Sequence, residues 1–193
     1  MHLQVKNCGG NGKFKMKVFI SGGAKSGKSS LAQRLAVQLA GSGKRYYVAT
    51  MIPTDAVDRR RIELHIEDRD GLGFETLECP RNISSSREFA ESDKQAVFLF
   101  DSVTAYLQNA LFPAEKNYEP DFAAAEKCAE ELLDVAAQVK HIIFVSDYIY
   151  SDAYGFEDFT ETYRRGLAHI DRALAKACDQ VIEVTFGFKY LYK

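Results

Sequence analysis

Apolar residues form two alternating patterns along the chain after residue 15. Short, nearly continuous apolar runs are typical of strands buried on both faces of a sheet, and longer stretches with apolar positions about every three to four residues indicate helices. We predict strands over 16–21, 45–50, 74–78, 96–101, 142–146 and 180–186. We predict helices over 28–39, 55–70, 103–112, 123–139 and 159–177. This alternation favours an α/β fold with a mostly parallel sheet flanked by helices.

The same pattern favours a single domain. The 193 residues contain no internal repeat, low-complexity stretch or linker, and domains usually have about 100–200 residues. We therefore expect one domain over 16–193 and treat 1–15 as an N-terminal appendage without chemistry. The apolar run over 188–192 would return beside the last strand as a C-terminal antiparallel hairpin.

The composition excludes some classes of function and indicates the cellular compartment. The formal net charge of −2 argues against a sequence-independent nucleic-acid binder, which needs a strong basic excess. The longest apolar runs, such as 96–100, are far shorter than the ~18 residues of a membrane span. Cys8, Cys79, Cys128 and Cys178 are scattered without a C-x-x-C pair. This spacing suggests neither a disulfide framework nor a zinc site, and we expect a cytoplasmic protein.

A glycine-rich motif joins the first predicted strand to the first predicted helix. It has the P-loop pattern G-x-x-x-x-G-K-S and consists of Gly22, Gly23, Ala24, Lys25, Ser26, Gly27, Lys28 and Ser29. The glycines let backbone N–H groups converge on phosphate oxygens, Lys28 reaches the β- and γ-phosphates, and the Ser29 hydroxyl is a ligand for Mg²⁺. Because the motif lies between a strand and a helix, whose N-terminus favours anions, we interpret it as a nucleoside triphosphate site. The alternative is a glycine-rich turn with a solvated lysine.

Asp101 ends an apolar strand, which is where P-loop folds place the acid that helps to hold the metal ion. The alternative interpretation is a helix cap, because Asp-Ser before a helix is a normal N-terminus. The motifs together predict a P-loop NTPase-type protein. They do not decide the reaction, since several classes of enzyme share this fold.

With these motifs in order, the chain resembles the bifunctional adenosylcobinamide kinase/adenosylcobinamide-phosphate guanylyltransferase family of cobalamin biosynthesis over about 16–193. The shared landmarks are G-G-A-K-S-G-K-S-S at 22–30, Y-V-A-T at 47–50, R-I-E-L-H-I-E-D-R at 61–69, F-E-T-L-E-C-P at 74–80 and F-D-S-V-T-A-Y-L-Q-N at 100–109. The resemblance implies a trimeric α/β enzyme that uses ATP, GTP and Mg²⁺. It would phosphorylate the side-chain hydroxyl of adenosylcobinamide and then transfer GMP from GTP onto that phosphate.

The resemblance also implies a covalent step at His65. This histidine would attack the α-phosphorus of GTP, expel pyrophosphate and hold GMP until the acceptor arrives. A neutral imidazole is a competent nucleophile. Arg61 lies one helical turn earlier on the same face, where its charge would help to neutralise phosphate. From the residues alone, the simpler interpretation of His65 is a solvated surface histidine of a charged helix.

Further nucleotide-binding residues follow from the resemblance. They are Thr50, Met51, Arg69, Glu78 and Asp101. For Glu78 the alternative is an exposed carboxylate at a strand end.

The last third of the chain departs from the family pattern. Where members typically read N-E-V-G after a strand, this chain has Asp147-Tyr148-Ile149-Tyr150, and Asp171-Arg172 replaces a later N-Q pair. The departures leave two alternatives open. One is a P-loop kinase or nucleotidyltransferase of the same family with a changed acceptor, for which Tyr148, Tyr150 and Tyr154 would line a pocket. The other is a nucleotide-binding regulatory protein without turnover.

Lys28 provides the first test, because its ammonium is the side-chain cation that the motif commits to the β- and γ-phosphates. Losing one close charge pair of this kind costs about 2–5 kcal/mol. We expect Lys28→Ala to weaken binding of GTP and ATP by at least about tenfold while the circular dichroism spectrum stays that of the wild type. Isothermal titration calorimetry measures the change, and an unchanged Kd would contradict the P-loop interpretation.

Overall fold

A seven-stranded sheet organises the structure, a computed structural model that describes residues 15–114, 118–149 and 156–193. The strand order is β3-β2-β4-β5-β1-β6-β7. The strands are β1 (Met16–Gly22), β2 (Arg45–Ala49), β3 (Glu75–Glu78), β4 (Val97–Asp101), β5 (His141–Asp147), β6 (Gln180–Thr185) and β7 (Phe188–Leu191). β1 to β6 pair in parallel, and β7 returns antiparallel beside β6. The mostly parallel sheet and the C-terminal hairpin are thus confirmed.

Six α-helices and one short 3₁₀ helix connect these strands in the described part of the chain. They are α1 (Lys28–Ala40), α2 (Ala56–Asp68), the 3₁₀ helix η1 (Ile83–Ser85), α3 (Arg87–Glu91), α4 (Val103–Leu111), α5 (Ala124–Gln138) and α6 (Asp158–Ala177). The five helices expected from periodicity begin and end within about two residues of these bounds. η1 and α3 were not predicted, because so few residues do not complete a recognisable helical period.

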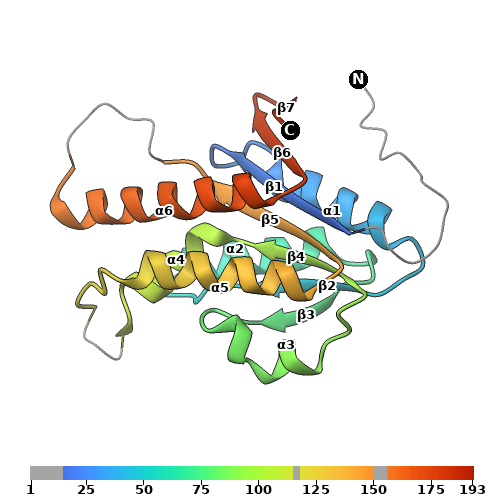
Figure 1. Cartoon of the computed structure of the whole chain (residues 1–193), viewed down its shortest axis with the longest axis horizontal. Helices are drawn as coiled ribbons and strands as arrows, with labels where there is room; N and C mark the ends of the chain where they lie inside the picture. Colours follow the sequence, from blue (N-terminus) through green and yellow to red (C-terminus); the bar gives the residue numbers. More distant parts are fainter. Residues whose placement is uncertain (1–14, 115–117, 150–155) are drawn as a thin grey trace.

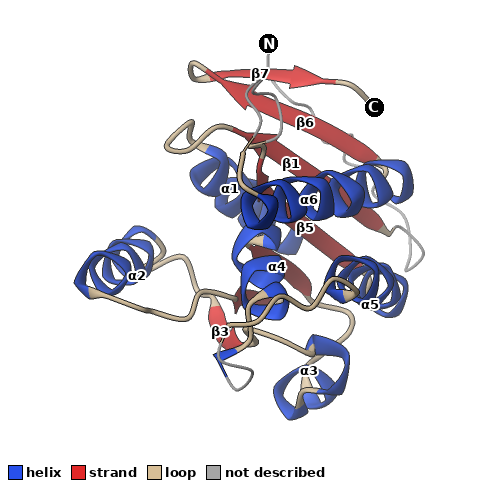
Figure 2. Ribbon diagram, turned by 90° about the vertical axis from the view of Figure 1, so that its left-hand side faces the viewer, coloured by secondary structure: helices blue, strands red, loops and turns tan. Residues whose placement is uncertain are grey.

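The sheet separates two apolar clusters, because successive side chains of a strand point to opposite faces. Phe98 and Phe100 of β4 belong to the larger cluster, and Leu99 between them belongs to the smaller one. Residues of α4, α5 and α6 complete the larger cluster, and residues of α1 complete the smaller. Figures 1 and 2 show α5 and α6 on one side of the sheet and α1 on the other. Both faces are therefore covered, as near-continuous apolar strands require.

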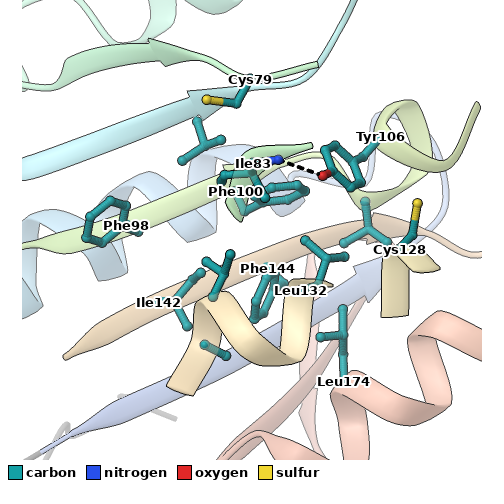
Figure 3. Packing of buried hydrophobic residues seen from close by; sticks show 14 of the residues in the cluster. Cys79, Ile83, Phe98, Phe100, Tyr106, Cys128, Leu132, Ile142, Phe144 and Leu174 are labelled. Carbon is teal, nitrogen blue, oxygen red and sulfur yellow. Dashed lines mark hydrogen bonds between the residues drawn. The ribbon is translucent and has the colours of Figure 1, made fainter. Parts of the chain in front are cut away.

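In the larger cluster, aromatic rings and aliphatic side chains pack together between the sheet and the helices (Figure 3). The Phe100 ring packs edge-on against the Tyr106 ring, with 5.2 Å between the ring centroids. Its centroid lies 5.7 Å from that of the tilted Phe144 ring. The Tyr106 hydroxyl accepts a hydrogen bond from the Ile83 N–H at 3.0 Å and donates to Glu131. A buried tyrosine needs such partners for its polar end, so this hydroxyl attaches η1 to the core.

Helix α2 stands apart from both layers (Figure 2). Asp55 caps it by accepting a hydrogen bond from the Asp58 N–H at 2.8 Å. The helix has no buried residue, and it exposes Val57, Leu64 and Ile66. Local capping and charge pairs such as Arg60–Glu63 therefore stabilise it more than packing does.

Two expectations from the sequence fall wholly or mostly on residues that the structure does not describe. Apart from Lys15, the predicted appendage over 1–15 lies outside the described residues, as do Tyr150 and Tyr154. Among the described helices, none combines the length and apolar character that crossing a membrane requires.

Phe98 offers a test of the larger cluster. Its side chain is fully buried, and its ring lies 5.0 Å from Tyr46 and 5.8 Å from Phe89 between centroids. We expect Phe98→Ala to lower the free energy of unfolding by about 3–5 kcal/mol. Phe188→Ala is the matched control, because that phenylalanine is 69% exposed and its loss should cost no more than about 0.5 kcal/mol. Urea denaturation compares the two variants, and equal losses would contradict this account of the core.

Candidate functional site

The carboxyl ends of the parallel strands form the edge at which the candidate residues meet. Gly22 at the end of β1 is in register with Asp147 at the end of β5. Ala49 at the end of β2 is in register with Asp101 of β4 and Glu78 of β3. Ligands of open α/β sheets bind at this edge, outside the carboxyl ends of the strands.

The predicted phosphate cradle leaves β1 at this edge and enters α1. Lys25 and Gly27 have φ angles of 57° and 94°, in the left-handed region. A Cβ on Gly22 would lie 2.3 Å from the carbonyl oxygen of Val184, so only glycine fits there. No side chain caps α1, whose N-cap residue is Gly27. The first-turn N–H groups of α1 therefore have no side-chain acceptor, which is the arrangement that suits an anion.

Lys28 is buried beneath the cradle and held by two oxygen atoms. Its Nζ donates to the carbonyl oxygen of Gly23 at 2.7 Å and to Oδ1 of Asp147 at 2.6 Å. The two charged side chains expose only 6% and 18% of their surface. A charge pair so far from solvent is screened little by salt, and it links the P-loop directly to β5.

Asp101 ends β4 and is oriented by an aromatic side chain. The Tyr47 hydroxyl donates to Oδ2 of Asp101 at 3.1 Å. Burial and the Asp101 charge raise the pKa of Tyr47, so its phenol keeps the proton that it donates. The cap of α4 is Ser102, whose hydroxyl accepts from the Ala105 N–H at 3.3 Å. The Asp101 carboxylate is therefore not the N-cap of α4.

Thr50 and Asn109 brace the loops around the edge. The fully buried Thr50 hydroxyl donates to the carbonyl oxygen of Ser102 at 2.9 Å and accepts from the Ser102 N–H at 2.7 Å. Asn109 Nδ2 donates to the carbonyl oxygens of Thr50 at 2.7 Å and Pro80 at 3.1 Å. The side chain of Thr50 thus belongs to the wall of the site. Asn109, which the sequence interpretation left outside the site, holds two of its loops together.

A cavity of about 110 Å³ opens beside the cradle. The loop after β2, the first half of α2, one side of α4 and the end of β5 form its walls. Its lining residues include Met51, Thr54, Asp58, Arg61, Thr104, Gln108, Asn109 and Asp147. Asp147 belongs both to this cavity and to the ion pair with Lys28. The cavity and the cradle are therefore neighbours that share one carboxylate.

His65 lies in the second half of α2, and Arg69 follows the helix at its C-terminus. His65 is partly buried, and its Nδ1 is enclosed without a hydrogen-bond partner among the described residues. Arg61, one turn earlier, lines the cavity, whereas His65 is not among the lining residues. The Arg69 guanidinium stacks over Tyr47 at 4.2 Å and donates to the Thr76 hydroxyl at 3.3 Å. Arg69 thus contacts the residue that orients Asp101.

The sequence interpretation missed Asp147 and Thr104 as candidates. Asp147 carried the same signal as Asp101, an acid directly after a buried strand. Thr104, in the first turn of α4, lines the cavity and accepts the Asp147 N–H at 2.8 Å. No pattern in the sequence marks this threonine, because its role depends on a strand more than forty residues away.

Comparison with known proteins gives the family. The family described as cobinamide kinase / cobinamide phosphate guanyltransferase matches residues 18–191. The bifunctional adenosylcobalamin biosynthesis protein CobP of Pseudomonas aeruginosa is 30% identical over 174 residues, which cover 89% of this chain and 94% of that protein. The bifunctional adenosylcobalamin biosynthesis protein CobU of Salmonella typhimurium is 24% identical over 182 residues, 89% of this chain and 97% of that protein. The chain belongs to this family and is an enzyme of cobalamin biosynthesis.

Solved structures show a shared fold at much lower sequence identity. The flagellar accessory protein FlaH of Methanocaldococcus jannaschii is similar with a TM-score of 0.54 at 17% identity, over 93% of this chain and 80% of that chain. An ATPase of a bacterial type III secretion system is similar with a TM-score of 0.51 at 14% identity, over 88% of this chain and 51% of that chain. At these identities the similarity concerns the fold alone, which is the P-loop α/β fold that the sequence predicted.

Asn109 provides a test of how the loops are braced. Its amide serves two backbone carbonyls, and each lost hydrogen bond of this kind costs about 0.5–1.5 kcal/mol. We expect Asn109→Ala to lower the free energy of unfolding by about 1–3 kcal/mol and to weaken nucleotide binding. Gln138→Ala is the control, since that exposed amide bonds to the exposed Asp134 side chain one helical turn away. Chemical denaturation with calorimetry measures both, and a wild-type stability for Asn109→Ala would contradict the bracing role.

Proposed function

We propose that this enzyme phosphorylates the side-chain hydroxyl of adenosylcobinamide at the P-loop and transfers GMP from GTP onto that phosphate through His65. The family supplies the two reactions by its description. The residue assignment rests on one observation. The phosphate cradle, Asp101 and the cavity lie together at one edge of the sheet.

In this proposal the P-loop binds the phosphates of ATP or GTP. The backbone N–H groups of 22–29 and the N-terminus of α1 face the phosphate oxygens, and Lys28 neutralises the β- and γ-phosphates. The uncapped start of α1 and the steric need for Gly22 support this assignment. Thr50 and Met51 form the adjoining wall, and Arg69 acts through Tyr47. Glu78, exposed at the end of β3, completes the nucleotide-binding set.

Ser29 and Asp101 are the residues that we assign to Mg²⁺. Both offer oxygen, which is the donor that Mg²⁺ prefers, and Mg²⁺ usually combines one or two protein ligands with substrate phosphates. The described residues contain no group of three His, Cys, Asp or Glu side chains able to hold a metal ion, so phosphate oxygens would complete the coordination. Bound there, Mg²⁺ neutralises the negative charge that develops on the phosphates during transfer.

The cavity beside the cradle is the proposed acceptor site for the kinase step. Sites that enclose a drug-sized ligand have volumes of about 300–1,000 Å³, so 110 Å³ suits only a hydroxyl-bearing side chain. We assign the cavity to that arm of adenosylcobinamide, with the corrin ring outside it.

His65 carries the second reaction in two displacements. An imidazole nitrogen bonds to the α-phosphorus of GTP as the bond to pyrophosphate breaks. A phosphate oxygen of adenosylcobinamide phosphate then bonds to the same phosphorus as the bond to His65 breaks, which releases the neutral imidazole. Arg61 on the same helix is placed to offset the charge of the phosphates.

The assembly that we propose is a homo-oligomer, and the family resemblance suggests a trimer. The exposed apolar side chains of Val57, Leu64 and Ile66 on α2 support this proposal, because a neighbouring subunit would cover them. The cytoplasm is the proposed compartment, and the free thiols of Cys79, Cys128 and Cys178 are compatible with it.

Covalent labelling tests the role of His65. After incubation with radiolabelled GTP and Mg²⁺, we expect a GMP adduct on the peptide that contains His65, labile to acid and stable to mild base. Adenosylcobinamide phosphate should discharge the label, because it accepts the GMP. We expect His65→Ala to form no adduct, whereas His169→Ala, which alters an exposed histidine of α6, should label as the wild type does. Peptide mass spectrometry locates the adduct, and label retained by His65→Ala would refute the assignment.

A further inference from the structure

One position beside the cradle carries an acid where the family pattern has an amide. Members typically read N-E-V-G after this strand, and in this chain the same segment begins with Asp147-Tyr148. Aspartate and asparagine have nearly the same size, so the difference is one negative charge. That charge lies 2.6 Å from the Lys28 ammonium. Its effect is therefore a property of this chain and not of family members that carry the asparagine.

The backbone holds this carboxylate beside the cradle. The Asp147 N–H donates to the Thr104 hydroxyl at 2.8 Å, and the Tyr148 N–H donates to the carbonyl oxygen of Gly22 at 3.3 Å. Asp147 and Gly22 are also partners in the register of β1 and β5. Because the chain is bonded on both sides of the carboxylate, the negative charge stays at the cradle when a nucleotide enters.

A bound nucleotide would bring its phosphates close to the same charge. The P-loop motif commits Lys28 to the β- and γ-phosphates, and the Nζ atom of Lys28 is the atom that Asp147 contacts. Two oxygen atoms that bond to one nitrogen are at most about 6 Å apart. At that separation, two like charges near a protein surface repel strongly enough to change a binding constant by about tenfold or more.

The side chains at this end of the site offer no surplus of positive charge to offset that repulsion. Lys28 and Asp147 cancel each other. Among the described residues that line the cavity, Arg61 is the only cation, and Asp58 lines the same cavity. Lys25, the other cation of the motif, is exposed to solvent, where salt screens its charge. A triphosphate therefore depends on the cation that it brings with it.

We propose that Asp147 makes nucleotide binding by this chain dependent on Mg²⁺, and this inference rests on the proposed P-loop site. In the empty cradle the carboxylate pairs with Lys28. When a nucleotide binds, the ammonium gains phosphate oxygens as partners, and the carboxylate repels those phosphates. A nucleotide that arrives with Mg²⁺ carries two fewer net negative charges, so the repulsion falls mainly on the metal-free form. Asp147 is thus a specificity-determining residue that selects the metal-bound nucleotide.

The experiment measures the Kd for ATP and for GTP by isothermal titration calorimetry, once with excess Mg²⁺ and once with EDTA. The ratio of the metal-free Kd to the Mg²⁺ Kd reports the selection. We expect Asp147→Asn to tighten metal-free binding and to lower this ratio by at least about tenfold. Asp147→Ser is neutral too and should also lower the ratio, so the result does not depend on the fit of one amide. Asp134→Asn, an exposed change on α5, is the matched control and should keep the wild-type ratio.

The results that contradict the proposal differ from one another. Equal ratios for the wild type and Asp147→Asn would overturn the selection of the metal-bound form. Weaker binding of both forms by Asp147→Asn, with the circular dichroism spectrum of the wild type, would show instead that the ion pair supports the cradle. A wild type that binds neither ATP nor GTP in the presence of Mg²⁺ would refute the proposed P-loop site, and the role of Asp147 with it.

Discussion

The parallel pairing of β1 with both β5 and β6 is the constraint on which the rest of the structure depends. Parallel strands in register end at the same edge, so the P-loop at the end of β1 and Asp147 at the end of β5 are brought together. β4 pairs on the other side of β5 and adds Asp101 to the same edge. The charges of the site therefore meet because the apolar strands β1, β4 and β5 pair, and helices bury these strands on both faces.

Several polar groups at this edge are paired with one another. Thr50 bonds to Ser102, Tyr47 bonds to Asp101, and Asn109 bonds to two loops. Such pairs satisfy groups that would otherwise be buried at a cost. They also fix the geometry of the edge before a ligand binds, which reduces the entropy lost on binding and reaction.

Helix α2, unlike this edge, is not fixed by buried side chains. It carries His65 and Arg61, yet it buries no residue in the chain and stands apart from the layers. Because none of its residues is buried, its free energy of displacement is expected to be low. A rigid phosphate cradle and a peripheral helix are thus joined in one chain, and the two proposed reactions divide between them. In the proposed function, phosphoryl transfer uses the rigid edge and GMP transfer uses the helix.

The sequence by itself determined the elements and the chemistry that is local in the chain. Apolar runs and helical periodicity predicted the strands and five helices, and the G-x-x-x-x-G-K-S motif predicted the phosphate cradle, because the residues of each feature are neighbours in sequence. Only the tertiary structure decided which distant side chains meet. The tertiary structure paired Lys28 with Asp147 across 119 positions and the Thr50 hydroxyl with Ser102. It also made Ser102 rather than Asp101 the cap of α4, and it gave Asn109 and Thr104 their hydrogen-bond partners. Strand order and register create these contacts. That order is selected by the burial of the central strands between the helices, and no local pattern in the sequence encodes it.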